Sequence, residues 1–280
     1  MKNIFSGLEQ FGLNNLQEMN VFEKEDAKQS QAEKKEPPKV VEADLLFDKT
    51  FVCPVCDNEF KSKTVKTGKI KLLSADSDLR PKYQHVDSLK YDAILCPKCG
   101  YAALNRYFNF MTSVQGKLIR EKISANYKAK EFSEDTYSYD EAINRHKMAL
   151  LSTIVSNGKN SERAYTCLKL AWLVRGKSEN LPADTKNIEQ VKNELTTMEL
   201  DFIQNAYEGF SKAFSTEPFP MCGMDENTML YLIADLARRC GKFEESARYV
   251  SQLLVAKDAT DRLKAKAREL KEILKQDLSK

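Results

Sequence analysis

Two Cys-Pro-x-Cys turns constrain the fold of this chain more than any other feature. They are Cys53-Pro54-Val55-Cys56 and Cys96-Pro97-Lys98-Cys99. Each turn presents two thiolates from one tight bend, and two such bends complete the tetrahedral four-sulfur shell that Zn²⁺ prefers, at Zn–S distances of about 2.3 Å. We therefore predict that Cys53, Cys56, Cys96 and Cys99 bind one Zn²⁺ ion. Because four soft ligands leave no open coordination position, the ion would be structural.

Because the two turns are far apart in the sequence, other kinds of cysteine site must be considered. Residues 57–95 between them exceed the usual zinc-ribbon spacing of roughly 15–20 residues, which indicates an insertion between the knuckles. A thioredoxin-like redox site would need one such pair at the start of a helix within a βαβ unit. An iron–sulfur centre also accepts four cysteines, and the sequence leaves it open. We expect His85, inside the insertion, to lie at the surface or in a hydrogen bond, because four sulfurs already complete the shell.

The remaining cysteines and the hydropathy point to a reducing compartment. Seven cysteines are an odd number, and paired spacing in such a compartment favours metal over disulfides, which leaves Cys167, Cys222 and Cys240 as free thiols. No apolar run reaches the roughly 18–20 residues that a membrane span needs, and the N-terminus lacks the pattern of a signal peptide. The sequence therefore predicts a cytoplasmic protein without a membrane partner.

Charge gives little support for nucleic-acid binding by the whole chain. Its 44 basic and 41 acidic residues leave a net charge of +3, whereas phosphate binding needs clustered excess charge. A local basic face is one hypothesis, because period-two alternation could align four lysines on one side of a β-hairpin. The alternative is a solvated edge hairpin whose lysines prevent edge-to-edge pairing. The four lysines are Lys61, Lys63, Lys69 and Lys71.

The first 46 residues are predicted to be an amphipathic segment followed by a disordered linker. Apolar residues recur at roughly helical spacing up to residue 22, and the stretch from Glu23 to Asp44 is rich in charge and contains Pro37-Pro38. Such a stretch cannot bury enough surface to offset its ordering entropy. The apolar segment is a candidate partner-binding element, either for another protein or for a groove on its own body. Its candidate contact residues are Phe5, Leu8, Phe11 and Leu16.

Residues 47–110 are predicted to form a small, β-rich, zinc-ribbon-like head. Short strand-like runs are separated by turn-forming residues, which is typical of an irregular metal-stabilised module. The runs are Phe51-Val52, Thr64-Val65, Ile70 to Leu73 and Tyr91 to Leu95, with turns at residues 74–78 and 80–81.

Residues 111–280 are predicted to be a helical domain. The pattern gives helices at about 102–127, 139–157, 160–175, 185–216, 226–240, 243–257 and 261–277. Polar residues stand at the expected N-caps, and glycines stand where helices should stop. The predicted caps are Ser138, Asn160, Asp184, Asp225 and Thr260, and the predicted stops are Gly158, Gly176 and Gly241.

The helices also repeat, which favours TPR-like antiparallel pairs. The pattern small-x3-large-x2-apolar recurs from Ala164, Ala206 and Ser246, as in the second helix of a TPR unit. The offsets of 42 and 40 residues exceed the TPR period of 34 residues, so the helices should be longer. Small residues would let paired helices approach closely. The predicted fold is therefore mainly α-helical with a small β-rich head.

No group of residues has the spacing of a catalytic site. We expect His146, between Arg145 and Lys147, to face solvent. Arg175 lies one turn after Trp172, which is most simply packing with a guanidinium that reaches the surface. Cys222 has no neighbouring base. The sequence therefore predicts a protein that is not an enzyme.

Several short motifs together resemble one bacterial family of unknown function, number 2225 in the domain-of-unknown-function series. The resemblance covers roughly residues 47–270. It implies a zinc-binding head on TPR-like helices, and it brings no activity with it. The motifs are the first cysteine turn, Asp76-Ser77-Asp78, Cys96-Pro97-Lys98-Cys99-Gly100-Tyr101-Ala102, Ala171-Trp172-Leu173-Val174-Arg175, and Tyr231-Leu232 leading to Arg239.

Two functions from different classes follow. The first is a protein-interaction scaffold or adaptor, because a repeat architecture without a catalytic group is typical of partner binding. The alternative is a nucleic-acid-associated zinc-ribbon protein that uses the lysine-rich insertion. Salt dependence separates them, because phosphate contacts weaken log-linearly with salt concentration.

Overall fold

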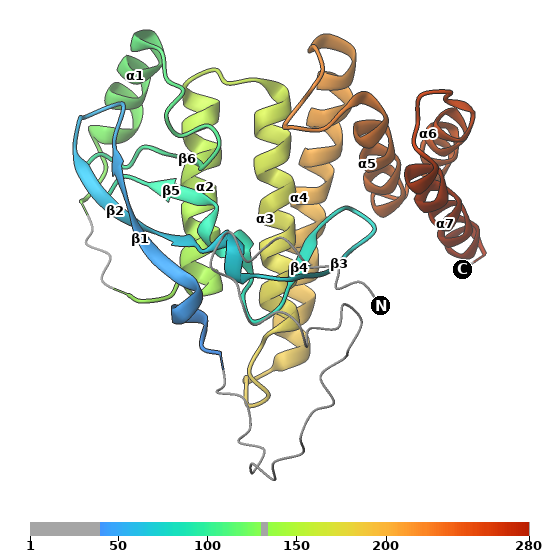
Figure 1. Ribbon diagram of the computed structural model, residues 1–280, viewed down its shortest axis with the longest axis horizontal. Coiled ribbons are helices and arrows are strands. Elements are labelled where there is room, and N and C mark those ends of the chain that lie inside the picture. Colours follow the sequence, from blue (N-terminus) through green and yellow to red (C-terminus); the bar gives the residue numbers. More distant parts are fainter. Residues whose placement is uncertain (1–39, 130–133, 280) are drawn as a thin grey trace, which may run out of the picture. The chain divides into compact units, whose positions relative to one another are not determined.

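The computed structural model describes residues 40–129 and 134–279 (Figure 1). The chain is mainly helical, with small β-hairpins in its N-terminal part and helices packed in antiparallel pairs, as predicted. The candidate partner-binding residues Phe5, Leu8, Phe11 and Leu16 lie outside the described residues. The domain boundaries proposed at residues 46 and 110 remain predictions.

The β-sheets of residues 40–129 and 134–279 are three two-stranded antiparallel hairpins. Two of the predicted runs, Phe51-Val52 and Thr64-Val65, lie in the first hairpin. Residues 74 and 75, predicted as a turn, extend a strand instead, and Pro81 begins the next one. The pairs are β1 (Leu46–Val52) with β2 (Glu59–Val65), β3 (Leu72–Ala75) with β4 (Pro81–Tyr83), and β5 (Ala93–Leu95) with β6 (Ala102–Leu104).

The end of the predicted linker is structured. Residues Glu42–Leu45 form a 3-10 turn that leads directly into β1. The Glu42 carboxylate accepts hydrogen bonds from Lys90 Nζ and from the Tyr91 hydroxyl, both at 2.9 Å. The prediction of a linker up to Asp44 was therefore wrong for its last residues. Their anchors lie almost fifty residues downstream, which local composition does not reveal.

The predicted helix over 102–127 was also wrong. Its first residues form β6, because the chain turns back after the second cysteine pair to hydrogen-bond with β5. A seven-residue helix, α1 (Ser113–Ile119), begins later at a capping box of Thr112 and Gln115. It continues as a π-helical turn, Arg120–Ser124. Strand pairing imposed by the cysteine turn has overridden the helical pattern of the sequence.

The other six helices lie close to their predicted positions, and consecutive members contact each other. Side chains of Ser138, Asp225 and Thr260 cap α2, α5 and α7 as predicted. The N-caps of α3 and α4, however, are Lys159 and Asn187. The helices are α2 (Tyr139–Val155), α3 (Asn160–Glu179), α4 (Ile188–Thr216), α5 (Glu226–Arg239), α6 (Phe243–Val255) and α7 (Asp261–Leu278).

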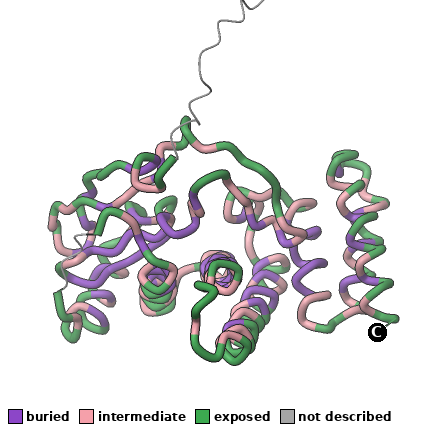
Figure 2. Tube along the Cα trace, turned by 90° about the horizontal axis from the view of Figure 1, so that it is seen from below, coloured by how far each residue is buried: buried purple, intermediate pink, exposed green. Residues whose placement is uncertain are grey.

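The largest core lies along α3. Every residue from 166 to 174 is buried, because α2 and α4 contact this helix from two sides (Figure 2). Gly176 does not end α3 as predicted. It lies within the helix, where an added Cβ would stand 2.7 Å from the Tyr139 ring, so its small size permits close packing. Gly241, with φ of +73°, follows the end of α5 as predicted.

Candidate metal centre

The two cysteine turns have the same backbone geometry although they lie in different hairpins. In the first, Asp57 N donates to Cys53 O at 2.9 Å, and Cys53 N donates to Asn58 O at 3.0 Å. In the second, Gly100 N donates to Cys96 O at 3.1 Å, and Cys96 N donates to Tyr101 O at 2.8 Å. The residue after each second cysteine is left-handed, with φ of 55° at Asp57 and 76° at Gly100. The β1–β2 and β5–β6 hairpins thus end in equivalent knuckles.

The structure brings all four predicted cysteines together. Their Sγ atoms lie within 4.8 Å of one another. The Cys53–Cys99 pair is 3.6 Å apart and the Cys56–Cys96 pair is 3.7 Å apart. Four sulfurs held tetrahedrally 2.3 Å from one zinc ion would be about 3.8 Å apart. The spacing therefore fits one ion, whereas a multi-iron cluster distributes its thiolates over several metal atoms.

The cysteine cluster is shielded from water. Cys53, Cys96 and Cys99 are buried and Cys56 is half-buried. The hydrogen bond with Cys53 lowers the pKa of Cys96 below its ordinary value, and the backbone N–H groups of Lys98 and Cys99 lower it further. These groups stabilise a thiolate at Cys96, which is the form that binds metal, whereas the hydrogen bonds with Cys96 and Cys99 and burial raise the pKa of Cys53. In the described part of the chain this is the one cluster of three or more residues with metal-ligand atoms close together.

The knuckles are held by aromatic packing and by one arginine. Tyr101 and Phe108 have ring centroids 5.1 Å apart, and the Tyr101 hydroxyl donates to Phe108 O at 3.0 Å. Phe51 meets Phe108 edge-on at 5.6 Å. Arg120, in the π-helical turn, donates from Nη1 to Val55 O at 2.8 Å. A residue that follows the second cysteine turn in the sequence therefore holds the first turn in place.

Replacement of Gly100 tests this geometry. We expect Gly100→Ala to lower the free energy of unfolding by at least about 1–2 kcal/mol, the cost of a left-handed backbone for an L-residue. The added Cβ would also clash with the Tyr127 ring. Urea denaturation measures the change. Gly68→Ala is the control, since nothing lies within 4 Å of an added Cβ there. Equal stability of both variants would contradict the prediction.

The four lysines of the predicted basic face do not share one hairpin face. Lys61 and Lys63 lie on β2, whereas Lys69 is in a 3-10 turn and Lys71 precedes β3. Lys63 pairs with Asp48 at 3.1 Å. Strand register also puts the acidic Glu59 on the face of Lys61 and Lys63. The hypothesis that the four lysines align on one hairpin was therefore wrong, because the turn at residues 66–71 ends the alternation.

The two histidines have opposite environments. His85 is exposed, as expected, and lies outside the cysteine cluster. His146 is fully buried on α2, which contradicts the prediction that it faces solvent. Its Nδ1 lies 2.8 Å from Ala142 O. Burial lowers its pKa to about 4, against the opposing charge of Asp92. The helix α2 packs against β5, β6 and α3, and the charged neighbours Arg145 and Lys147 gave no sign of this burial.

His146 makes stability depend on pH. Because its pKa of about 4 in the folded protein is below the ordinary 6.5, the unfolded chain binds the proton first. The contribution of His146 to the free energy of unfolding is fully present above pH 6.5. It decreases by about 3 kcal/mol as the pH falls towards 4. Urea unfolding in this window measures the slope. We expect His146→Gln to flatten it and His85→Gln, at the only other histidine, to leave it unchanged. A slope unaffected by His146→Gln would refute the assignment.

A second cluster, which sequence reasoning missed, lies at the β3–β4 loop. We expected the Arg175 guanidinium to reach the surface, but carboxylates from other elements hold it. It donates to Asp78 at 2.6 Å, to Asp76 at 3.0 Å and to Glu199 at 2.8 Å. Arg239 contributes from α5, donating from Nη2 to Ser77 at 3.0 Å. We call this set the loop-docking cluster: Asp76, Ser77, Asp78, Arg175, Glu199, Asp235 and Arg239.

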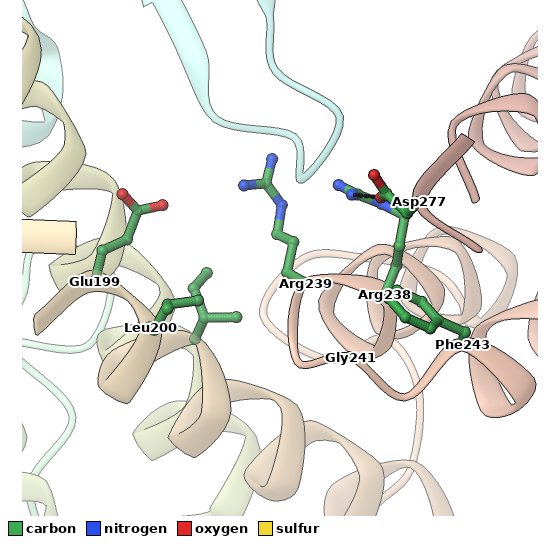
Figure 3. A pocket seen from close by; sticks show the side chains of 8 residues that line it. Glu199, Leu200, Arg238, Arg239, Gly241, Phe243 and Asp277 are labelled. Atoms are coloured by element: carbon green, nitrogen blue, oxygen red, sulfur yellow. Dashed lines mark hydrogen bonds and ion pairs between the residues drawn. The ribbon is translucent and has the colours of Figure 1, made fainter. Parts of the chain in front are cut away.

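The signal for this cluster was present in the sequence. Asp76-Ser77-Asp78, Arg175 and Arg239 are among the motifs on which the family resemblance rests. They are far apart in the sequence and meet only in the fold. Beside them lies a cavity of about 430 Å³, between α4 and α5 (Figure 3). It is lined by Glu199, Leu200, Ile203, Arg238, Arg239, Gly241, Phe243 and Asp277.

Comparison with known proteins fixes the family and leaves the activity open. None of the helices that the structure describes is long and apolar enough to cross a membrane. A search of curated proteins and a search of solved structures each gave no match. The sequence model of one family, described as an uncharacterized protein conserved in bacteria, matches residues 46–274. The chain therefore belongs to this bacterial domain-of-unknown-function family, number 2225.

Proposed function

We propose that this chain is a non-enzymatic, zinc-binding scaffold or adaptor that binds another protein. The observation that carries the proposal is the closed cysteine shell, with four sulfur atoms within 4.8 Å. Zinc in such a shell has no position for substrate and acts by stabilising the fold. Cys53, Cys56, Cys96 and Cys99 would hold the ion and fix the two knuckles against each other.

The packed helices supply the surface for a partner. Antiparallel helix pairs leave grooves between neighbouring elements, and helical repeat proteins use such grooves to bind peptides. The repeats from Ala164, Ala206 and Ser246 support a TPR-like interpretation. In one crossing, an added Cβ at Gly209 would stand 2.8 Å from the Ala164 Cβ, which is the close approach that small residues allow.

The nucleic-acid alternative gains no support from the lysines. Lys63 is neutralised by Asp48, and the same face carries Glu59. Phosphate binding needs an excess of positive charge on one surface.

Affinity capture with the full-length, zinc-loaded chain tests the proposal. We expect a specific bacterial protein to be retained and, once purified, to rebind in isothermal titration calorimetry with defined stoichiometry. Matched experiments at low and high salt identify the kind of contact. Retention of nucleic acid with a steep log-linear salt dependence would contradict the proposal and favour the alternative. Failure of every captured protein to rebind would also contradict it.

A further inference from the structure

The cavity beside the loop-docking cluster has an apolar floor. Leu200 projects from α4 and is 49% exposed, although it lies among packed helices. Ile203, one turn along α4, is buried, and Phe243 at the start of α6 also lines the cavity. An exposed leucine above a buried isoleucine offers a place for one aliphatic side chain.

One wall of the cavity carries two arginines whose side chains are held in place by carboxylates. The buried carboxylate of Asp235 accepts from Arg238 Nε at 3.0 Å and from Arg239 Nε at 2.8 Å. Arg238 also donates to Asp277 at 2.7 Å. Arg239 uses Nη2 for Ser77, and its Nη1 has no hydrogen-bond partner among the described residues. Arg239 therefore presents an oriented, unused donor.

The opposite wall offers an acceptor. Arg175 donates to Glu199 Oε1, from Nε at 2.8 Å and from Nη2 at 2.7 Å. Glu199 Oε2 has no partner in the described part of the chain. Glu199 on α4 and Arg239 on α5 project towards the same space (Figure 3). A donor and an acceptor thus face a ligand from two sides of an apolar floor.

The charges of the cavity are already matched within the protein. Asp235, Asp277 and Glu199 neutralise the nearby arginines, so a highly charged ligand gains little here. An extended peptide backbone suits this arrangement better, since each peptide unit offers one carbonyl acceptor and one N–H donor without net charge.

We propose that this cavity binds an extended aliphatic segment of a partner polypeptide. Arg239 Nη1 donates to a main-chain carbonyl, Glu199 Oε2 accepts from a main-chain N–H, and an aliphatic side chain covers Leu200. The inference rests on the proposed scaffold function and assigns it a location and a ligand chemistry.

Selection from a phage-displayed library of random 12-residue peptides tests the assignment on the full-length, zinc-loaded chain. We expect enriched peptides to be aliphatic and nearly neutral. Synthetic fluorescein-labelled copies then give affinities by fluorescence anisotropy. Leu200→Asp should weaken binding at least tenfold, and Arg239→Lys should weaken it severalfold. Leu151→Asp is the matched control, because Leu151 is 44% exposed on α2 and outside this cavity. Its affinity should equal that of the unmodified chain.

Thermal melts of each variant, followed by Trp172 fluorescence, separate loss of binding from loss of folding. Binding unaffected by Leu200→Asp in a folded variant would overturn the assignment, even if affinity capture supports a scaffold function. Enrichment of acidic peptides whose binding disappears at high salt would overturn backbone recognition. Two other occupants are tested in parallel. Leu200-dependent binding of a synthetic peptide of residues 1–22, or Leu200-dependent dimerisation in size-exclusion chromatography, would overturn the assignment to a separate partner.

Discussion

Cys96→Ser is expected to abolish stoichiometric zinc binding and to unfold the cysteine-bearing hairpins. Serine removes one of four soft ligands, and the free energy of binding structural zinc, about 10–16 kcal/mol in peptide domains, is available only to the folded site. Elemental analysis of the purified protein should give one zinc per unmodified chain and much less for the variant. Iron in its place, or well-folded protein without metal, would refute the zinc assignment.

The helical core should survive this substitution. Trp172 is the only tryptophan and is 4% exposed in the core around α3, which is a separate hydrophobic cluster from the one that contains Cys53, Cys96 and Cys99. Its emission should therefore remain blue-shifted in Cys96→Ser. Cys240→Ser is the matched control, since Cys240 lies outside the cysteine cluster and should keep its zinc. A red-shifted Trp172 in Cys96→Ser would show that the metal supports the whole helical body.

Asp78→Ala is expected to lower the free energy of unfolding by about 3–5 kcal/mol, the usual cost of removing one partner of a buried ion pair. The side chain of Asp78 is 0% exposed and receives a hydrogen bond of 2.6 Å from Arg175. Its removal leaves Arg175 with Asp76 and Glu199 as partners and weakens the attachment of the β3–β4 loop to α3. Urea denaturation gives the change.

Lys192→Ala provides the comparison. Lys192 pairs with Glu189 at 3.5 Å on an exposed part of α4, and surface pairs of this kind contribute about 0–1 kcal/mol. An equally small effect for Asp78→Ala would show that the loop-docking cluster is dispensable for stability.

The environment of Asp78 also predicts that the free energy of unfolding decreases in acid. Burial by itself raises the pKa of this carboxyl, but hydrogen bonding from Arg175 and the charge of Arg239 bring it below its ordinary value of 3.8. The folded protein therefore holds the carboxylate more strongly than the unfolded chain does. This stabilisation is present above pH 3.8 and disappears as the pH falls through the lower pKa of the folded state.

The sequence predicted the cysteine cluster correctly because its signal is local. Each Cys-Pro-x-Cys turn defines its own backbone geometry, and the left-handed residue that follows is a glycine in one knuckle and an aspartate in the other. The helices α2 to α7 were predictable for the same reason. The periodicity of apolar residues and N-caps such as Ser138 and Thr260 are local features of the sequence.

The errors have a common cause. His146 and Arg175 were expected at the surface, but His146 is fully buried and the half-buried Arg175 is held by Asp78 from the β3–β4 loop. The helix expected from residue 102 gave way to β6, because pairing with β5 was decided by the cysteine turn. In each case a contact between distant segments outweighed the local pattern.

The sequence by itself therefore determined the two cysteine turns and the helical character, since both depend on residues a few positions apart. Only the tertiary structure decided that Asp78, Arg175 and Arg239 form one cluster and that Glu199 faces Arg239 across an apolar floor. These four residues are 24 to 161 positions apart in the sequence, so the energetic gain of bringing their charges together exists only once β3, β4, α3, α4 and α5 have packed.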